Sequence, residues 1–150
     1  MLLLDLDGFK RVNDSAGHAV GDVLLVQVAE RLQHATRGCD LVARLGGDEF
    51  AVLLNDVHAN GDLITVAERI VGAIARPFTV QETVCVVGVS VGIARGADTD
   101  ASVDALMRNA DLALYEAKAR GKGQHAFFDP DMHVAAVERV ALEAALRSGL

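Results

Sequence analysis

The stretch RLGGDEFAVLL, from Arg44 to Leu54, places two glycines and two adjacent acids between apolar runs of the kind that form strands. Glycine adopts the positive φ angles that tight hairpin turns require, so the stretch predicts two short strands with Asp48 and Glu49 at the tip between them. A charged tip alone is ordinary. A second acidic pair, however, lies in the apolar run LLLDLD at Leu2–Asp7. The fold decides whether the two acidic pairs meet.

Composition limits the fold and the function classes. A chain of 150 residues with 51% hydrophobic side chains suffices for one domain with a full core and is too short for two. Its net charge of -7 disfavours general nucleic-acid binding, which needs a basic face. No apolar run reaches the roughly 18 residues of a membrane span, and the start lacks the basic flank of a secretory signal. We therefore expect a cytoplasmic domain without membrane contact, in which Cys39 and Cys85 are small buried residues.

The spacing of apolar residues predicts the order of the elements. Along the chain it indicates a strand at 1–6, a helix at 20–36, two hairpin strands around 46–49 and a helix at 63–74. A short strand at 77–80 follows, paired with a long central strand at 83–94. The last elements are a helix at 103–120 capped by Ser102, a strand at 124–128 and an amphipathic helix from Asp131. This order predicts an α/β fold in which helices pack against a mostly antiparallel central sheet.

Two interpretations of the acidic residues stay open at this point. In the first, the hairpin tip is a solvated turn and an aspartate near the start of the chain caps a helix. In the second, the first strand and the hairpin are neighbours, so that Asp5 and Asp48 converge on a hard divalent cation. Mg²⁺ is such a cation, because it takes oxygen ligands and is typically held by one or two carboxylates together with substrate phosphates.

The segments DLDGFKRVNDSAGHAVGD, at 5–22, and RLGGDEF, at 44–50, carry a more specific signal. In order and spacing they resemble the GGDEF family of diguanylate cyclases, which join two GTP molecules into cyclic di-GMP with loss of two pyrophosphates. The resemblance extends to FFDPDMH at 127–133 and implies a palm-like domain similar to nucleotidyl cyclases. We expect this domain at 1–130, without the helix that usually precedes it in the family. The helix at 131–150 resembles a linker that leads into an EAL phosphodiesterase domain.

The resemblance implies a metal-dependent active site. Asp5, the backbone carbonyl of Leu6, and Asp48 would hold two Mg²⁺ ions, with Mn²⁺ as a substitute, and Glu49 would act as a base or support the metal ligands. Two metal ions can activate an attacking 3′-hydroxyl and neutralise charge on a triphosphate. For Asp7 we expect a structural role, such as capping the short helix that follows it.

The resemblance also implies the residues that bind GTP. Three parts of the chain would contact the phosphates: the start of that short helix, the GGDEF turn and two lysines near the C-terminus. At the start of the helix, the backbone N–H groups and the helix dipole suit an anion. Guanine selection falls to an Asn and an Asp, since a carboxylate accepts from N1–H and the amino group of guanine, whereas adenine has a bare acceptor at N1. The residues are Phe9, Lys10, Gly46, Lys118 and Lys122 for the phosphates, and Asn13 and Asp22 for guanine. Without the resemblance, the C-terminal lysines are also compatible with a solvated helix end.

Arg37 and Asp40 form an R-x-x-D arrangement, with five residues between Asp40 and Gly46. In the family this spacing forms a product-binding site, so the resemblance implies feedback inhibition by cyclic di-GMP. Because one site holds one GTP, the implied reaction requires a homodimer. Two alternatives remain: a non-catalytic module that binds GTP or cyclic di-GMP within a larger signalling protein, and a related cyclase that acts on another nucleotide.

Overall fold

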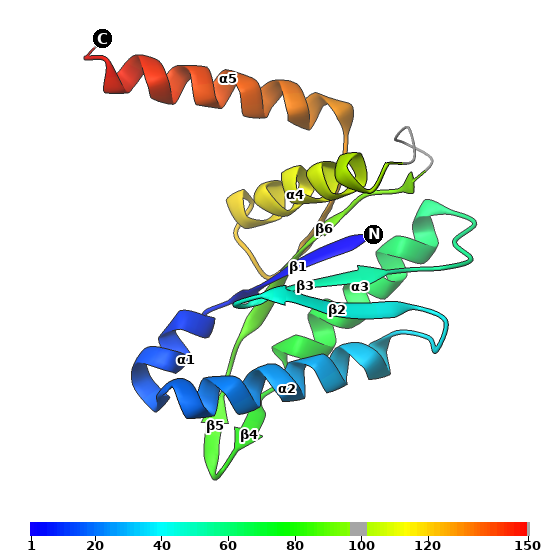
Figure 1. The fold of residues 1–150 in the computed structure, drawn as a ribbon, viewed down its shortest axis with the longest axis vertical. Helices are drawn as coiled ribbons and strands as arrows, with labels where there is room; N and C mark the ends of the chain where they lie inside the picture. The colour runs from blue at the N-terminus through cyan, green and yellow to red at the C-terminus, as the bar shows by residue number, and fades with distance from the viewer. Residues whose placement is uncertain (97–101, 150) are drawn as a thin grey trace.

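The computed structural model describes residues 1–96 and 102–149 and has a five-stranded sheet at its centre (Figure 1). The strands of this sheet are β1 (Leu2–Asp7), β2 (Leu41–Gly46), β3 (Glu49–Leu53), β6 (Gly88–Ile93) and β7 (His125–Phe127). They lie in the order β2-β3-β1-β6-β7, and every neighbouring pair is antiparallel except β6 and β7. The predicted mostly antiparallel sheet is confirmed.

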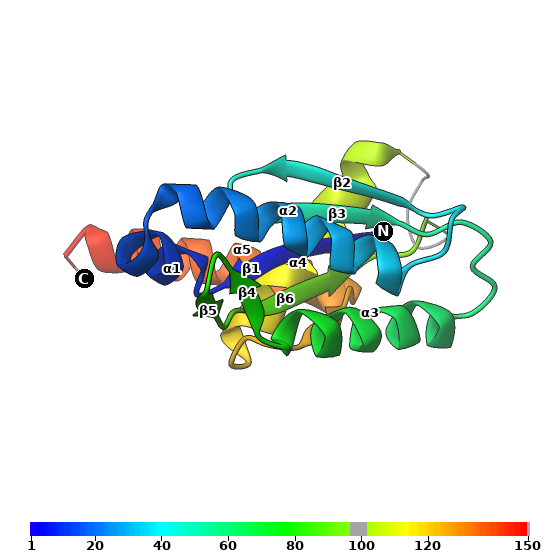
Figure 2. The ribbon, with the colours of Figure 1, turned by 90° about the horizontal axis from the view of Figure 1, so that it is seen from below.

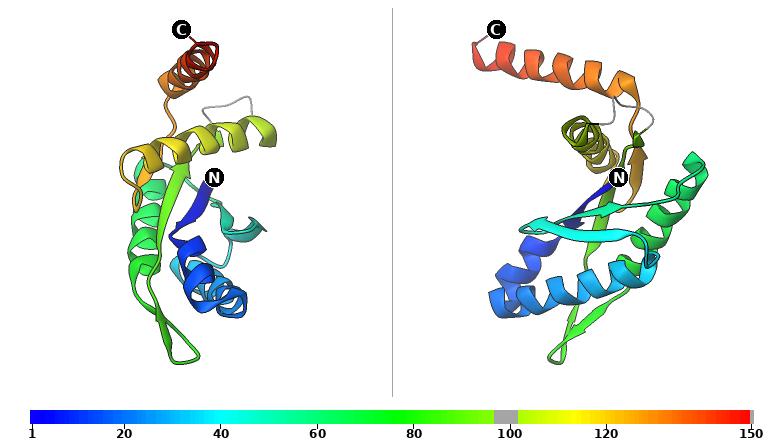
Figure 3. Two further views of the ribbon diagram at one scale, coloured as in Figure 1. Left: turned by 90° about the vertical axis from the view of Figure 1, so that its left-hand side faces the viewer. Right: turned by 45° about the vertical axis from the view of Figure 1, so that its right-hand side comes forward.

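Helices cover both faces of the sheet. They are α1 (Phe9–Ala16), α2 (His18–Ala35), α3 (Asn60–Ala75), α4 (Val103–Ala119) and α5 (Pro130–Arg147). Figure 2 shows α2 and α3 on one face of the sheet, with α4 on the other. Helix α5 contacts α4 and extends beyond the rest of the chain (Figure 3). Among the described residues, no helix is both long enough and apolar enough to cross a bilayer.

Strand β1 has a different environment on each face, because successive side chains of a strand point to opposite faces. Its even-numbered leucines enter the large core that they share with α2 and α3. On the other face, Leu3 packs in a smaller cluster with Leu114 of α4. Asp5 and Asp7 continue the Leu3 face. The acids of β1 therefore lie on the side of the sheet that α4 covers.

The register of the sheet brings the hairpin tip to β1. Asp5 lies opposite Glu49 of β3 on one side and opposite Ser90 of β6 on the other. The backbone N–H of Leu6 also donates to the carbonyl oxygen of Asp48 at 3.1 Å. The first strand and the hairpin are therefore neighbours, as the second interpretation of the acidic residues requires.

The prediction of one strand at 83–94 is wrong. Its first part, β5 (Thr83–Cys85), pairs with β4 (Phe78–Val80) in a separate two-stranded sheet, and the central sheet receives only β6. The apolar run continues without interruption through this region, so its pattern does not reveal that the hydrogen-bonding partner changes after β5. Gln81 and Glu82 form the turn between β4 and β5 with positive φ angles.

Three smaller expectations also differ from the structure. Helices α2 and α3 begin at His18 and Asn60, earlier than predicted, because their first turns are largely polar or small and give no amphipathic signal. Cys85 is buried as expected, but Cys39 is exposed in the loop between α2 and β2. A small apolar side chain is buried only where the fold brings packing partners to it.

Candidate active site

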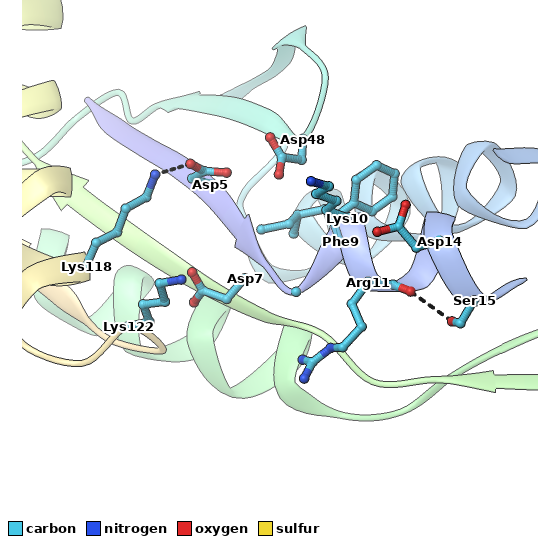
Figure 4. A pocket seen from close by; sticks show the side chains of 12 residues that line it. Asp5, Asp7, Phe9, Lys10, Arg11, Asp14, Ser15, Asp48, Lys118 and Lys122 are labelled. Atoms are coloured by element: carbon cyan, nitrogen blue, oxygen red, sulfur yellow. Dashed lines mark hydrogen bonds and ion pairs between the residues drawn. The ribbon is translucent and has the colours of Figure 1, made fainter. Parts of the chain in front are cut away.

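A cavity of about 710 Å³ opens where β1 ends and α1 begins (Figure 4). Its walls come from β1, α1, the tip of the β2–β3 hairpin, the C-terminal end of α4 and the turn after α4. The lining residues are Asp5, Leu6, Asp7, Gly8, Phe9, Lys10, Arg11, Asp14, Ser15, Asp48, Lys118 and Lys122. The structure thus brings the predicted metal ligands and most of the predicted phosphate contacts into one cavity.

Asp5 and Asp48 reach this cavity from β1 and from the hairpin tip (Figure 4). Burial and then the negative charge of Asp5 raise the pKa of Asp48 above its ordinary value. Carboxylates that interact in this way repel each other, and a bound cation would relieve the repulsion. Leu6 belongs to the core, so it contributes its main chain to the cavity.

Lys118 supplies a cation at this place. Its ammonium group pairs with Asp5, 113 residues away in the sequence (Figure 4). Burial by itself lowers the pKa of Lys118, but the hydrogen bond to Asp5 and the negative charges of the neighbouring aspartates outweigh burial and raise the pKa. Lys118 is therefore protonated at neutral pH and stands where the two carboxylates favour positive charge.

The donor set of the cavity suits Mg²⁺. Asp5, Asp48 and the main chain of Leu6 offer oxygen atoms, which are the ligands that Mg²⁺ prefers. Within residues 1–96 and 102–149, no group of three His, Cys, Asp or Glu side chains is arranged to hold a metal ion by itself. Mg²⁺ commonly completes its coordination with water and substrate phosphates. The arrangement therefore fits metal ions that bind together with a phosphorylated ligand.

Groups that attract anions line the same cavity. Lys10 comes from α1, Lys118 from α4 and Lys122 from the turn after α4. Gly8 precedes α1 with a φ angle of 85°, and no side chain caps this helix. The first N–H groups of an α-helix have no partner within the helix, so those of α1 can donate to an anion in the cavity.

The sequence profile described as "Diguanylate cyclase, GGDEF domain" matches residues 1–124. The chain belongs to the GGDEF domain family. Over its whole length it is 42% identical to the bifunctional diguanylate cyclase/cyclic di-GMP phosphodiesterase MucR of Pseudomonas aeruginosa. The chain spans 22% of the length of MucR.

Solved GGDEF domains share this fold. The GGDEF domain of TpbB, also called YfiN, from Pseudomonas aeruginosa superposes with a TM-score of 0.86 at 35% identity, covering 90% of this chain and 79% of that chain. The GGDEF domain of DgcB from Caulobacter crescentus, in complex with c-di-GMP, gives a TM-score of 0.75 at 30% identity over 84% and 75% of the two chains. These similarities confirm the predicted fold class.

Asn13 and Asp22, predicted to select guanine, do not line the cavity of this GGDEF domain. The Oδ1 atom of Asn13 is buried and has no hydrogen-bond partner in the described part of the chain. It lies against α2, where a Cβ atom added to Gly21 would be 1.8 Å from it. Asp22 follows Gly21 and is exposed. A buried acceptor without a donor costs free energy.

Gly46 and Glu49 of the GGDEF turn are exposed and also lie outside the cavity lining. Gly46 has a φ angle of 146° at a shift of register between β2 and β3, a conformation that favours glycine. Its position therefore has a structural explanation within the hairpin. Glu49 directly follows Asp48 and lies opposite Asp5 of β1 in the sheet.

Arg11, Asp14 and Ser15 line the cavity and were not predicted. Helical spacing would have found Asp14, because it lies one turn after the predicted Lys10. The amphipathic pattern of α1 is too short to be recognised with certainty from eight residues.

The predicted capping role of Asp7 is wrong. Gly8 is the N-cap residue of α1, and no side chain accepts a hydrogen bond there. Asp7 instead accepts hydrogen bonds from Ser90 and Gly123. These partners come from β6 and from the turn after α4, which no local pattern connects to Asp7.

A second cavity, of about 350 Å³, contains Arg37 and Asp40 in its lining. Asp40 accepts hydrogen bonds from the backbone N–H groups of Arg37 at 2.9 Å and Asn55 at 3.1 Å. Burial by itself raises the pKa of Asp40, but these hydrogen bonds and the charge of Arg37 outweigh it and lower the pKa. The Arg37 guanidinium donates to the carbonyl oxygen of Asn55 at 2.6 Å. These hydrogen bonds thus hold Arg37 and Asp40 beside the second cavity.

Proposed function

We propose that this GGDEF domain is a diguanylate cyclase, which condenses two GTP molecules into cyclic di-GMP and two pyrophosphates. The observation that carries the proposal is the single cavity in which Asp5 and Asp48 lie beside Lys10, Lys118 and Lys122. Carboxylates and ammonium groups together suit a triphosphate that binds with its metal ions. The name of its relative MucR, a bifunctional diguanylate cyclase, supports the same activity.

In the proposed reaction, the 3′-oxygen of one GTP attacks the α-phosphorus of the other, and the bond from that phosphorus to pyrophosphate breaks. The reciprocal attack by the other 3′-oxygen then closes the ring and releases the second pyrophosphate. Two Mg²⁺ ions held by Asp5, Asp48 and the Leu6 carbonyl, or Mn²⁺ in their place, would supply activation of the hydroxyl and neutralisation of the triphosphate charge. The proton of the hydroxyl passes to a base, for which Glu49 at the hairpin tip is the candidate. Glu49 alternatively supports the metal ligands.

Binding of the triphosphate falls to residues that already face the cavity. Lys10, Lys122 and the first N–H groups of α1, beginning at Phe9, contact the phosphates. Lys118 would also contact the phosphates if a metal ion took its place beside Asp5. Gly46 allows the backbone of the turn to approach the nucleotide. Holding the phosphates in this way contributes orientation and electrostatic stabilisation, the main protein contributions to phosphoryl transfer.

Selection of guanine follows from Asn13 and Asp22. The unpaired Oδ1 atom of Asn13 needs a donor, and the amino group and N1–H of guanine supply donors to these two side chains. Adenine presents a bare acceptor at N1, so ATP would leave the buried Oδ1 atom of Asn13 unpaired. The proposal therefore predicts a preference for GTP over ATP.

The reaction needs two such sites that face each other, so we propose a homodimer as the active form. We further propose that cyclic di-GMP inhibits the enzyme by binding at Arg37 and Asp40. An Arg guanidinium can bind phosphate or a guanine edge with two hydrogen bonds, and a carboxylate accepts from the other guanine edge. The related GGDEF domain of DgcB, solved in complex with c-di-GMP, supports product binding by such domains.

A second candidate function is a non-catalytic module that binds GTP or cyclic di-GMP and regulates an attached domain. The relative MucR favours this candidate, because its name includes a cyclic di-GMP phosphodiesterase activity and this chain spans only 22% of its length. In this proposal, residues 1–130 are the GGDEF domain and residues 131–150 connect it to an EAL domain. Under either proposal the domain works in the cytoplasm, where GTP is available.

The test is to incubate the purified chain, fused to a dimeric coiled coil, with GTP and Mg²⁺ and to quantify cyclic di-GMP chromatographically. We expect product from the wild type and a loss of at least about 100-fold with Asp48→Ala, because a metal ligand is removed. ATP in place of GTP should give no cyclic dinucleotide. Bound GTP without any product would contradict the cyclase and favour the regulatory module.

The same assay tests the inhibitory site. Added cyclic di-GMP should lower the rate of the wild type, and Arg37→Ala should relieve this inhibition while the initial rate stays within about twofold, because Arg37 lies in a separate cavity. Lys10→Ala serves as the contrasting variant, since it should lower the initial rate. Inhibition that persists unchanged in Arg37→Ala would remove the R-x-x-D site from the proposal.

A further inference from the structure

Asp7 is the last residue of β1 and lines the active-site cavity two positions after Asp5. This spacing puts both side chains on the same face of the strand, so Asp7 is a natural candidate for a third metal-binding carboxylate. The structure gives its oxygens other partners. The hydroxyl of Ser90 lies 2.9 Å from both carboxylate oxygens, and the backbone N–H of Gly123 donates to Oδ2 at 2.9 Å.

Ser90 orients the carboxylate of Asp7. It lies on β6, next to β1, and its exposure is 0%. A buried hydroxyl requires a hydrogen-bond partner, and Asp7 provides the acceptor. The carboxylate is therefore held from the sheet side and directed toward the turn after α4.

The turn after α4 has an unusual backbone. Gly121, Lys122 and Gly123 have φ angles of 125°, 63° and 63°. Side-chain-bearing residues such as Lys122 rarely adopt this left-handed conformation, so the turn needs contacts that hold it. Lys122 N–H donates to the carbonyl oxygen of Ala117 at 3.1 Å, which ties the turn to its own helix. The hydrogen bond from Gly123 to Asp7 ties it to the strand that carries Asp5.

We propose that Asp7 is a positioning residue and not a metal ligand: through Gly123 it holds the turn in the conformation that presents the Lys122 ammonium to the triphosphate. This inference rests on the proposed function. Lys122 lines the cavity and extends alongside Asp7 in Figure 4. In this role Asp7 makes no contact with the substrate, and its effect reaches the phosphates through the turn.

The two roles make different demands on the side chain. A metal ligand must keep its negative charge, whereas a positioning residue must keep its hydrogen bonds. In Asp7→Asn, the amide oxygen can accept from Gly123 N–H and the amide nitrogen can donate to the Ser90 hydroxyl oxygen. Asp7→Asn therefore preserves the hydrogen bonds without the charge, while Asp7→Ala loses both.

The probe is inorganic tripolyphosphate with Mg²⁺, titrated calorimetrically into the full chain. We expect Asp7→Ala to weaken binding about tenfold and Asp7→Asn to stay within about twofold of the wild type. In a Lys122→Ala background, Asp7→Ala should cause no further loss, because both changes remove the same contact. Electron paramagnetic resonance of Mn²⁺ at saturating tripolyphosphate should show equal metal binding in the wild type and Asp7→Asn.

Loss of bound Mn²⁺ in Asp7→Asn would make Asp7 a metal ligand and overturn the proposal. Fully additive losses in the Asp7→Ala, Lys122→Ala double variant would overturn it as well. If Asp7→Ala does not fold, Ser90→Ala takes its place, since it keeps the carboxylate and removes the donor that orients it. Unchanged tripolyphosphate affinity in Ser90→Ala would then contradict the positioning role.

Tripolyphosphate separates this test from the proposed function, because its binding requires neither guanine recognition nor turnover. A wild-type chain that binds tripolyphosphate and makes no cyclic di-GMP contradicts the cyclase and leaves the Asp7 test intact. A wild-type chain that does not bind tripolyphosphate overturns the role of Asp7, because Lys122 would then not be positioned for a phosphate.

Discussion

At the scale of a residue, the ionised carboxylate of Asp48 lowers the stability of the folded chain. Burial and the charge of Asp5 raise the pKa of Asp48 in the folded chain. The ionised form is therefore less favourable in the folded chain than in the unfolded one. This penalty is present at a pH above the raised pKa and is lost once the pH falls below the ordinary value of 3.8, where Asp48 is protonated in both states.

Asp48→Asn should remove this penalty. In EDTA at pH 7 we expect a small rise of about 2 °C in Tm over the wild type, measured by circular dichroism. The difference should shrink toward zero as the pH falls below 3.8. Glu138→Gln on the exposed part of α5 is the matched control for the loss of one negative charge, and it should leave Tm unchanged. Equal Tm values at pH 7 for wild type and Asp48→Asn would contradict the repulsion.

At the scale of an element, α4 connects the packing of the sheet with the chemistry of the site. It lies against β6 at Gly92, where an added Cβ atom would meet the carbonyl oxygen of Ala110 at 2.1 Å and the backbone N of Leu114 at 2.3 Å. Both contacts are with backbone, which cannot rotate away. One turn beyond Leu114, the same helix carries Lys118 to Asp5. The absence of a side chain at Gly92 therefore sets how closely Lys118 approaches β1.

Gly92→Ala should displace α4 from the sheet. We expect a decrease of about 3 kcal/mol in the free energy of unfolding in urea, as for other overpacked sites, and a weaker affinity for a non-hydrolysable GTP analogue. Gly72→Ala is the matched control, because Gly72 lies inside α3 with nothing within 4 Å of an added Cβ. Replacing a helical glycine with alanine should stabilise the chain by about 0.5–1 kcal/mol. A Gly92→Ala variant as stable as the wild type would show that α4 can shift without cost.

At the scale of the whole molecule, the carboxylates and lysines of the candidate site line the same cavity. Helix α5 leaves the sheet and is held to α4 in part by Arg139, whose guanidinium stacks 3.8 Å from the ring centroid of Tyr115. Among the described side chains of α5, the large exposed apolar ones are Val137, Val140, Leu142 and Leu146. The proposed reaction joins two nucleotides, so it needs two copies of this cavity.

The initial rate of cyclic di-GMP formation, divided by protein concentration, should rise with the concentration of the unfused chain. The reason is that association of two copies precedes the chemical step. Fusion to a dimeric coiled coil should remove this dependence by raising the effective concentration. The measurement is a series of initial rates over a hundredfold range of protein concentration, with fused Asp48→Ala as the blank. A rate per chain that is constant for the unfused protein would contradict the need for a second copy.

Much of the fold could be predicted because its signals are local. The continuous apolar run of β1, the two glycines of the hairpin and the N-cap at Ser102 are each signals carried by a few neighbouring residues. Ser102 Oγ does accept from Ala105 N–H at 3.1 Å. The break between β5 and β6 was missed because both halves are equally apolar and β-branched, and only their hydrogen-bonding partners differ.

The sequence by itself determined the residue types of the site, the order of its elements and, through its motifs, the GGDEF family. Only the tertiary structure decided which partner each carboxylate of β1 has. Asp5 and Asp7 lie two residues apart on the same face of β1, so the sequence pattern does not distinguish them. In the structure, Asp5 pairs with Lys118, whereas Asp7 accepts hydrogen bonds from Ser90 and Gly123. The physical reason is distance along the chain: these partners are more than 80 residues away, and sheet register and the packing of α4 bring them together.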